Sequence, residues 1–230
     1  MIDIHSHIIF GVDDGAKTID ESISLIKIEI ENGVTDIICT PHYRKGMFEA
    51  QSNLIEENFN KLVEEIKKLN LPINLYLGRE IYYNEKVLDK IKNKQLYSLN
   101  NSNKYLIEYS YTSNTEIDEH VYNFSRFGYQ MVIAHIERYE YITSLDYVYE
   151  LKELGALIQV NASTICGKNG HKQYKKVMNY IRNGLVDFVA SDIHFSRINY
   201  MKDAYNIIKK KCGIEIAEKL FNSNAKILIK

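Results

Sequence analysis

The stretch MIDIHSH, residues 1–7, decides the fold class, because it joins a short strand pattern to two histidines at the strand's carboxyl end. His5 and His7 are two positions apart, so both side chains point to the same face of an extended strand. This opening therefore predicts a strand that presents two imidazoles at its end.

Six further short runs follow this strand, and helical patterns separate them. Most are continuous apolar runs, which are typical of a parallel sheet covered on both faces. The predicted strands are Met1–His5, Val34–Thr40, Ile73–Gly78, Lys104–Glu108, Gln130–Ala134, Ala156–Asn161 and Val186–Ser191. Seven strands, each followed by a helix, favour a (β/α) barrel with one unit fewer than the standard eight, in a single domain over residues 1–230. An open doubly wound sheet is the alternative, since the counts alone do not separate the two folds.

The predicted helices carry apolar residues at helical spacing. One face of the first helix carries Ile19, Ile23, Ile26 and Ile30. Thr18 followed by Glu21 predicts a capping box at its start, and Gly33 predicts its end. The other predicted helices are approximately Leu54–Leu69, Glu85–Lys92, Glu116–Phe127, Ser144–Leu154, Tyr174–Arg182, Tyr200–Lys211 and Ile214–Phe221.

Charge and apolar patterning exclude several classes of protein. The net charge is -1, which leaves no electrostatic footprint for binding nucleic acid. The longest apolar runs are far shorter than the ~20 residues of a membrane span. The start of the chain lacks the pattern of a signal peptide, so we expect a cytoplasmic protein. Three scattered cysteines argue against a disulfide framework. A cysteine-based phosphatase needs a phosphate-binding loop that ends in an arginine, and no such loop follows Cys39 or Cys166.

Side chains that bind metals follow the predicted strands at their carboxyl ends, which meet at one edge of a parallel barrel. In strand order they are His5 and His7, His42, Glu80, Glu108, His135, and finally Asp192 and His194, while the sixth strand offers only Asn161. Imidazole and carboxylate suit zinc, manganese and iron. These donors exceed what one ion needs, so the sequence predicts two or three ions with a bridging carboxylate such as Glu80.

Asp14 has two interpretations. It lies in an Asp-Asp-Gly turn sequence, where it either shapes the turn or completes a third metal site near His42 and His194.

Arginines follow three of the predicted ligands. Arg44, Arg138 and Arg197 come after His42, His135 and His194, and guanidinium groups match phosphate oxygens bidentately. This placement indicates a phosphoryl substrate; the alternative is an ion pair at the edge of the barrel, for example between Arg138 and Glu137. The aromatic residues that could contact a substrate ring, or only pack at this edge, are Phe10, Tyr43, Tyr83 and Tyr111.

Six strings in this order resemble one known family: MIDIHSH at 1–7, VDDG at 12–15, RKGMFE at 44–49, EIYY at 80–83, IAHIERY at 133–139 and ASDIH at 190–194. They are similar to the bacterial protein tyrosine phosphatases of the polymerase and histidinol phosphatase (PHP) superfamily, found with capsule and exopolysaccharide genes. The resemblance runs nearly end to end.

The resemblance implies a distorted seven-stranded, TIM-like (β/α)7 barrel with three divalent ions, commonly manganese, with iron, zinc or cobalt as alternatives. The implied ligands of the first ion are His5, His7, Glu80 and Asp192. The second ion would share Glu80 and use Glu108 and His135. The third would use Asp14, His42 and His194. Arg138 and Arg197, which follow predicted ligands, are the predicted catalytic arginines, although Arg197 follows His194 at a shorter spacing than the family usually shows.

The predicted activity is metal-dependent hydrolysis of phosphotyrosine on a protein. The resemblance implies that the substrate is the tyrosine-rich tail of a bacterial tyrosine kinase that controls polysaccharide export, and it is compatible with a homo-oligomer. A small-molecule phosphatase of the histidinol-phosphate type is one alternative. A non-catalytic regulator that binds phosphorylated tails is another, although every predicted ligand position is occupied by a competent donor.

Overall fold

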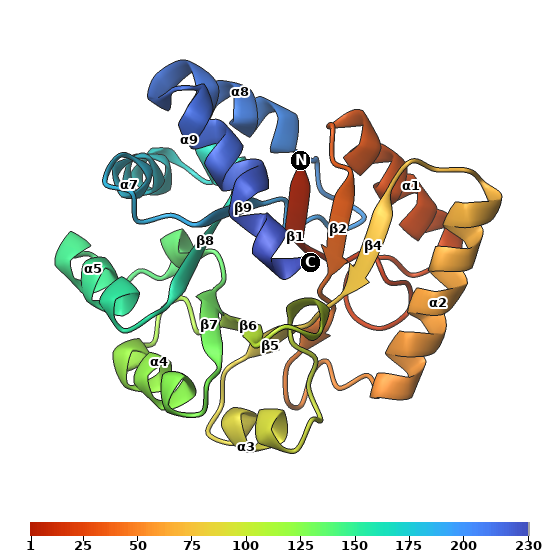
Figure 1. Cartoon of the computed structure of the whole chain (residues 1–230), viewed down its shortest axis with the longest axis horizontal. Coiled ribbons are helices and arrows are strands. Elements are labelled where there is room, and N and C mark those ends of the chain that lie inside the picture. The colour runs from red at the N-terminus through yellow and green to blue at the C-terminus, as the bar shows by residue number, and fades with distance from the viewer. Residues whose placement is uncertain (230) are drawn as a thin grey trace.

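The centre of the molecule is a curled parallel sheet, seen in the computed structural model, which describes residues 1–229 (Figure 1). One group of strands has the order β1 (Ile2–Ser6), β2 (Asp36–Cys39) and β4 (Asn74–Leu77). The other has the order β3 (His42–Tyr43), β5 (Glu80–Tyr82), β6 (Lys104–Glu108), β7 (Gln130–Ile133), β8 (Leu157–Asn161) and β9 (Phe188–Ala190). These strand pairings are all parallel, as predicted.

The predicted second and third strands are present as β2 and β4, but the count of seven strands was wrong, because a further short strand, β3 or β5, follows each of them after a break. Pro41 lies between β2 and β3 and has no backbone N–H for the ladder. Gly78 lies between β4 and β5, where a Cβ would come within 2.9 Å of the Ile38 side chain. The described residues therefore form nine strands, and β3 and β5 carry the chain into the second group.

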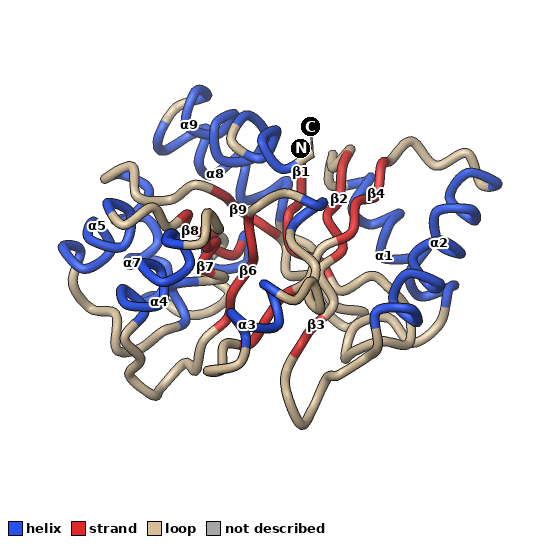
Figure 2. Tube along the Cα trace, turned by 60° about the horizontal axis from the view of Figure 1, so that its bottom comes forward, coloured by secondary structure: helices blue, strands red, loops and turns tan. Residues whose placement is uncertain are grey.

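The first and last strands lie side by side. The amide of His7 donates to the carbonyl of Ile193 at 3.0 Å, and the amide of Asp192 donates to the carbonyl of His5 at 2.9 Å. In Figure 2 both chain ends lie at one end of the strands, and long loops extend from the other end. The fold is thus a mixed α/β domain in which segments from both ends of the chain meet at the loop-bearing edge.

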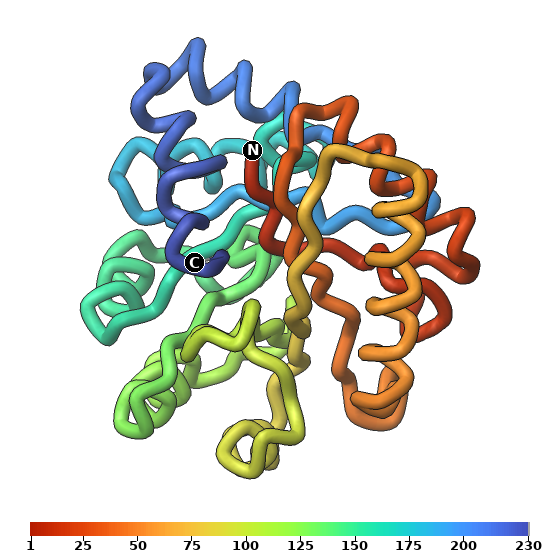
Figure 3. Tube along the Cα trace, turned by 45° about the vertical axis from the view of Figure 1, so that its right-hand side comes forward, coloured from red at the N-terminus to blue at the C-terminus, as the bar shows by residue number. Residues whose placement is uncertain are grey.

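Helices surround the strands, as Figures 1 and 3 show. They are α1 (Ile19–Glu31), α2 (Ser52–Lys68), α3 (Val87–Lys92), α4 (Ile117–Arg126), α5 (Leu145–Glu153), α6 (Ala162–Ile165), α7 (His171–Arg182), α8 (Met201–Cys212) and α9 (Ile214–Glu218). The short α6 was not predicted. Within residues 1–229, no helix has the length and apolar character needed to cross a bilayer.

The start and end of α1 confirm the predicted capping residues. The Thr18 hydroxyl accepts from the amide of Glu21 at 3.3 Å. The Glu21 carboxylate reaches back to the amide of Lys17 at 2.6 Å, one residue earlier than the usual capping box. Gly33 follows the helix with a φ of 83°, a left-handed conformation that glycine adopts without steric cost.

Candidate metal centre

His5 lies in β1 and His7 directly follows this strand, and both side chains point toward the carboxylate of Glu80 in β5. The Nε2 atoms of His5 and His7 are 3.2 Å apart, and they lie 3.2 and 3.3 Å from Oε2 of Glu80. All three side chains are buried. The spacing of two on an extended strand points both imidazoles the same way, as predicted.

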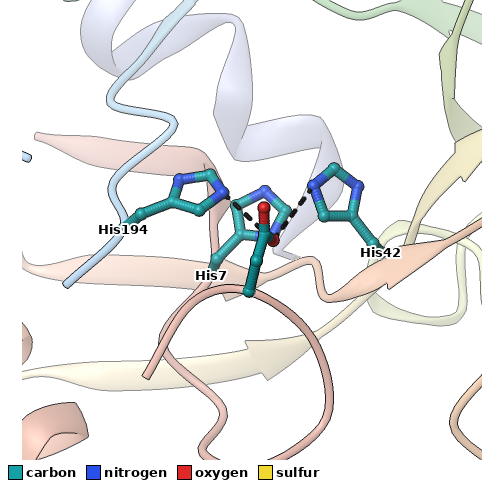
Figure 4. A group of neighbouring side chains, drawn as sticks. His7, His42 and His194 are labelled. Carbon is teal, nitrogen blue, oxygen red and sulfur yellow. Dashed lines mark ion pairs between the residues drawn. The ribbon is translucent and has the colours of Figure 1, made fainter. Parts of the chain in front are cut away.

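A second group gathers at the end of the sheet that carries the β1–α1 loop. His7, Asp14, His42 and His194 each offer an atom, and these atoms lie within 4.8 Å of one another. Figure 4 shows the imidazoles of His7, His42 and His194 turned toward a common point. Oδ1 of Asp14 lies 3.5 Å from Nε2 of both His42 and His194.

A third group surrounds the other side of Glu80. Nε2 of His135 is 2.9 Å from Oε1 of Glu80 and 3.7 Å from Oε1 of Glu108. Nδ1 of His42 is 2.8 Å from Oε2 of Glu80, and His42, Glu80 and Glu108 together offer atoms within 4.8 Å of one another. Glu80 therefore contacts four imidazoles, those of His5, His7, His42 and His135, and His42 faces more than one group.

Asp192 connects this centre to the arginines. Its Oδ1 lies 3.7 Å from Nε2 of His5 and 3.6 Å from Nε2 of His7. Its Oδ2 accepts from Arg138 at 2.9 Å and from Arg197 at 3.3 Å. The structure thus brings all nine predicted ligands to one site, with both predicted catalytic arginines beside it.

Several buried donor atoms at this site have no hydrogen-bond partner among the described residues. Nδ1 of His42 and Oε2 of Glu80 lie 2.8 Å apart without the alignment of a hydrogen bond, and Nε2 of His194, 3.5 Å from Oδ1 of Asp14, also forms none. Burying polar atoms without a partner is costly, so atoms left this way beside other imidazoles and carboxylates fit the coordination of divalent cations. The donor set contains only nitrogen and oxygen, which suits manganese, iron or zinc.

Burial and neighbouring charges move the pKa values of these groups apart. Burial raises the pKa of Glu108 to about 7, and the Glu80 carboxylate adds to the effect. Burial alone would raise the pKa of Glu80, but the imidazoles of His5 and His42 outweigh it and the pKa lies well below its usual value. Burial lowers the pKa of His135 to about 4, which keeps this imidazole neutral and able to bind a cation.

His7 has the opposite tendency. Burial opposes its protonation, but the Asp13 and Glu80 carboxylates together outweigh burial and raise the pKa of His7. Because a proton and a cation compete for the same nitrogen, metal binding at His7 would release a proton.

Three further residues orient the predicted ligands, a role that was not predicted from the sequence. Asp13 holds Nδ1 of His7 at 2.8 Å and accepts from the amides of His42 and Gly15, each at 2.9 Å. Gln159 uses Oε1 to hold Nδ1 of His5 at 3.3 Å and the amide of His135 at 2.8 Å. Asn161 donates to Oδ2 of Asp192 at 2.9 Å. The position of Asn161 at the end of a predicted strand could have indicated its role. No feature of the sequence indicated a role for Gln159, which lies inside the strand.

The donors open onto a cavity of about 190 Å³. Its wall includes Tyr111, whose hydroxyl donates to Glu108 at 2.9 Å and accepts from Arg138 at 3.1 Å. Met47 and Phe48 also line it and were not predicted. The other three predicted aromatic residues, Phe10, Tyr43 and Tyr83, are not part of this wall.

Arg44 lies at the cavity of the metal centre, whereas Cys39 and Cys166 are not part of its wall. Arg44 lines the same cavity and stacks over the ring of Tyr82 at 4.2 Å. Cys39 is buried inside β2, and burial raises the pKa of its thiol, so it is not an available nucleophile. Burial also raises the pKa of Cys166, to about 11. The prediction that these thiols have no catalytic part agrees with this placement.

A family model described as capsular polysaccharide synthesis, CpsB/CapC, matches residues 1–230. The chain belongs to the CpsB/CapC family. Among the relatives in this family, tyrosine-protein phosphatase CpsB of Streptococcus agalactiae is 40% identical over 239 residues, which cover 100% of this chain and 98% of the relative. Tyrosine-protein phosphatase CpsB of Streptococcus pneumoniae is 39% identical over 238 residues, with the same coverage.

The CpsB/CapC fold is also shared with a solved structure. That structure, described as YwqE from Bacillus subtilis and CpsB from Streptococcus pneumoniae, "unique metal-dependent tyrosine phosphatases", has a TM-score of 0.93 and 29% identity. The match covers 100% of this chain and 94% of that one. The resemblance stated from the sequence motifs is therefore confirmed at the level of the family.

Proposed function

We propose that this chain is a metal-dependent protein tyrosine phosphatase that hydrolyses phosphotyrosine on a protein. The observation that carries the proposal is the convergence of nine imidazole and carboxylate donors beside Arg138 and Arg197. The names of the CpsB relatives and of the solved structure support the same activity.

We assign three ions to the site, with manganese as the first choice and iron, zinc or cobalt as alternatives. The first would take His5, His7, Glu80 and Asp192, the second Glu80, Glu108 and His135, and the third Asp14, His42 and His194. The short distances from Glu80 to four histidines support its role as the shared carboxylate. Bound divalent ions supply charge for the phosphate oxygens and a lowered pKa for a coordinated water.

The chain's own groups position the phosphate. Asp192 holds Arg138 and Arg197 at one edge of the cavity, and each guanidinium keeps donors beyond those that Asp192 accepts. These donors would bind phosphoryl oxygens as negative charge develops. Arg138 is also anchored by the Tyr111 hydroxyl, so its fork is held in place before a substrate arrives. A phenolate leaving group has a conjugate acid of pKa about 10 and needs less protonation than an alkoxide.

The family also suggests which protein carries the phosphotyrosine. We propose that the phosphotyrosine lies on the tyrosine-rich tail of a bacterial tyrosine kinase that controls capsule or exopolysaccharide synthesis. The capsular polysaccharide synthesis description of the family supports this assignment. We also propose that residues 1–230 form one catalytic domain of the PHP type, with the divided strands counted as single units of a distorted (β/α)7 barrel.

The test is turnover of a phosphotyrosine peptide by protein stripped with a chelator and then reloaded with manganese. We expect activity to disappear with the chelator and to return with manganese. His42→Ala should lower kcat at least about 100-fold, because His42 faces two groups of donors. An exposed lysine variant, Lys209→Ala, is the matched control, and circular dichroism checks that both variants are folded.

Activity that survives removal of the metal would overturn the metal-dependent mechanism. If metal binds and small phosphate esters turn over while no phosphotyrosine peptide does, the substrate assignment is wrong. That second outcome would favour a small-molecule phosphatase.

A further inference from the structure

A larger cleft lies beside the metal centre, on the other side of Arg138. Its volume is about 480 Å³, and it lies between α7 and the segment that runs from β7 to the start of α5. We call it the lysine cleft, because α7 lines it with Lys172, Lys175 and Lys176. Figure 1 shows α7 and α5 in the outer ring of helices on the same side of the sheet.

Arg138 joins the two cavities. It lines the cavity of the metal centre and also the lysine cleft. Its guanidinium contacts Asp192 and Tyr111, on the side of the metal centre. The lysine cleft therefore lies within reach of residues that flank a phosphotyrosine bound beside Arg138.

Positive charge predominates in the lysine cleft. Arg138 is paired with Asp192, and the three lysines face two acidic side chains, Glu137 and Glu140. Glu137 is buried. Its Oε1 accepts from the amide of Asn161 at 3.0 Å and from the Thr164 hydroxyl at 2.9 Å, while its Oε2 has no hydrogen-bond partner in residues 1–229. The surplus of cations is complementary to an anionic segment of chain.

Two polar groups that line the cleft have unused hydrogen-bonding capacity. Tyr180 is only 3% exposed, and its hydroxyl has no hydrogen-bond partner in residues 1–229. Lys176 is half-buried and donates to the carbonyls of Tyr139 at 2.8 Å and Glu137 at 3.4 Å, which leaves one of its three donors. A buried hydroxyl without a partner costs free energy unless a ligand or water satisfies it.

We propose that the lysine cleft is a substrate subsite that binds carboxylate side chains flanking the phosphotyrosine, and so makes the enzyme prefer acidic peptides. The inference rests on the proposed phosphatase activity and adds the class of peptide that it selects. Lys172 and Lys175 are exposed and would attract the acidic segment, while Tyr180 would donate its free hydroxyl to a carboxylate.

The test compares two peptides that each carry one phosphotyrosine. One has three glutamates on each side of it, and the other has glutamines at the same positions. We expect wild-type enzyme to have a kcat/KM about tenfold higher on the acidic peptide, as exposed ion pairs each contribute modestly. This preference should fall to about twofold or less in Lys172→Ala/Lys175→Ala, and it should fall at least about threefold in Tyr180→Phe.

Lys209→Ala/Lys210→Ala on α8 is the matched control, because both lysines are exposed and lie outside the cleft. It should retain the wild-type preference. An equal preference in wild type and in the Lys172/Lys175 double variant overturns the subsite while leaving the phosphatase intact. No turnover of either peptide overturns the proposed function, and the subsite with it.

Discussion

Asp192 shows how one residue organises this site. Its two oxygens face different groups, since Oδ1 lies among imidazoles while Oδ2 accepts from Arg138, Arg197 and Asn161. Its backbone has a φ of 52°, a left-handed conformation that aspartate tolerates better than most residues. Burial would raise the pKa of Asp192, but Arg138 and His5 outweigh it and the pKa lies well below its usual range. The neighbouring cations therefore favour the ionised form of this carboxylate.

Asp13 orients the ligand His7 but is not itself a proposed ligand. Its substitution therefore tests how much the orientation of a ligand contributes to metal binding. Asp13→Asn keeps the size of the side chain but removes the charge that fixes the His7 imidazole. We expect manganese affinity to weaken about 10- to 100-fold, as for other residues that orient a metal ligand. Isothermal titration calorimetry with manganese measures this directly.

The control for that prediction is Asp20→Asn, in the exposed first turn of α1. Its manganese affinity should equal that of the wild type. If Asp13→Asn also binds manganese as tightly as the wild type, Asp13 serves only the turn that leads to α1.

Among the elements, the β1–α1 loop is the most constrained. A Cβ on Gly15 would lie 2.0 Å from the carbonyl oxygen of His7, so only glycine fits there. The amide of Ala16 donates to the same carbonyl at 3.2 Å, which holds the loop against the end of β1. This close approach places Asp13 and Asp14 beside the histidines.

The packing of α1 against β1 includes an acidic pair. Glu29 is fully buried, both of its carboxylate oxygens lack hydrogen-bond partners in residues 1–229, and burial together with Asp3 raises its pKa well above 4.5. The folded protein thus holds a proton that the unfolded chain releases above pH about 4.5. The free energy of unfolding therefore decreases as the pH rises above about 4.5.

Glu29→Gln should remove this pH dependence. We expect it to raise the free energy of unfolding relative to wild type by about 1 kcal/mol or more at pH 8, and by less at pH 5. Urea unfolding at the two pH values measures the difference. Glu31→Gln, an exposed neighbour on the same helix, should show no such trend. A Glu29→Gln difference that is equal at both pH values would contradict the argument.

At the scale of the whole molecule, the proposed ligands come from segments between residues 5 and 194 and include residues of both strand groups. A cation bound to them would connect parts of the chain that otherwise pack only through the sheet. Ligands that bind only the folded state stabilise it in proportion to the logarithm of their concentration.

Manganese should therefore raise the melting temperature of chelator-treated protein. At about 100 times the dissociation constant, the added stability is about 2.7 kcal/mol, which corresponds to about 5–10 °C for a domain of this size. Differential scanning calorimetry measures the shift. Glu80→Gln should show a much smaller one, because Glu80 is the shared carboxylate. Equal melting temperatures with and without manganese would refute the proposed site.

The sequence by itself determined the parallel α/β architecture, the positions of most strands and helices, and the family. The period of the apolar residues encodes the elements, and the carboxyl ends of parallel strands meet at one edge, so strand-end donors had to converge. The capping residues of α1 were readable for the same local reason. The strand breaks at Pro41 and Gly78 were not predicted, because they depend on how neighbouring strands approach each other.

Only the tertiary structure decided which side chains face one another. Asp13 with His7, Gln159 with His5 and Arg138 with Asp192 are pairs whose distances depend on the whole fold rather than on local spacing. The lysine cleft is of the same kind, since α7 and the segment after β7 line it together. A periodic pattern specifies the face on which a residue lies, but contacts between distant segments follow from packing.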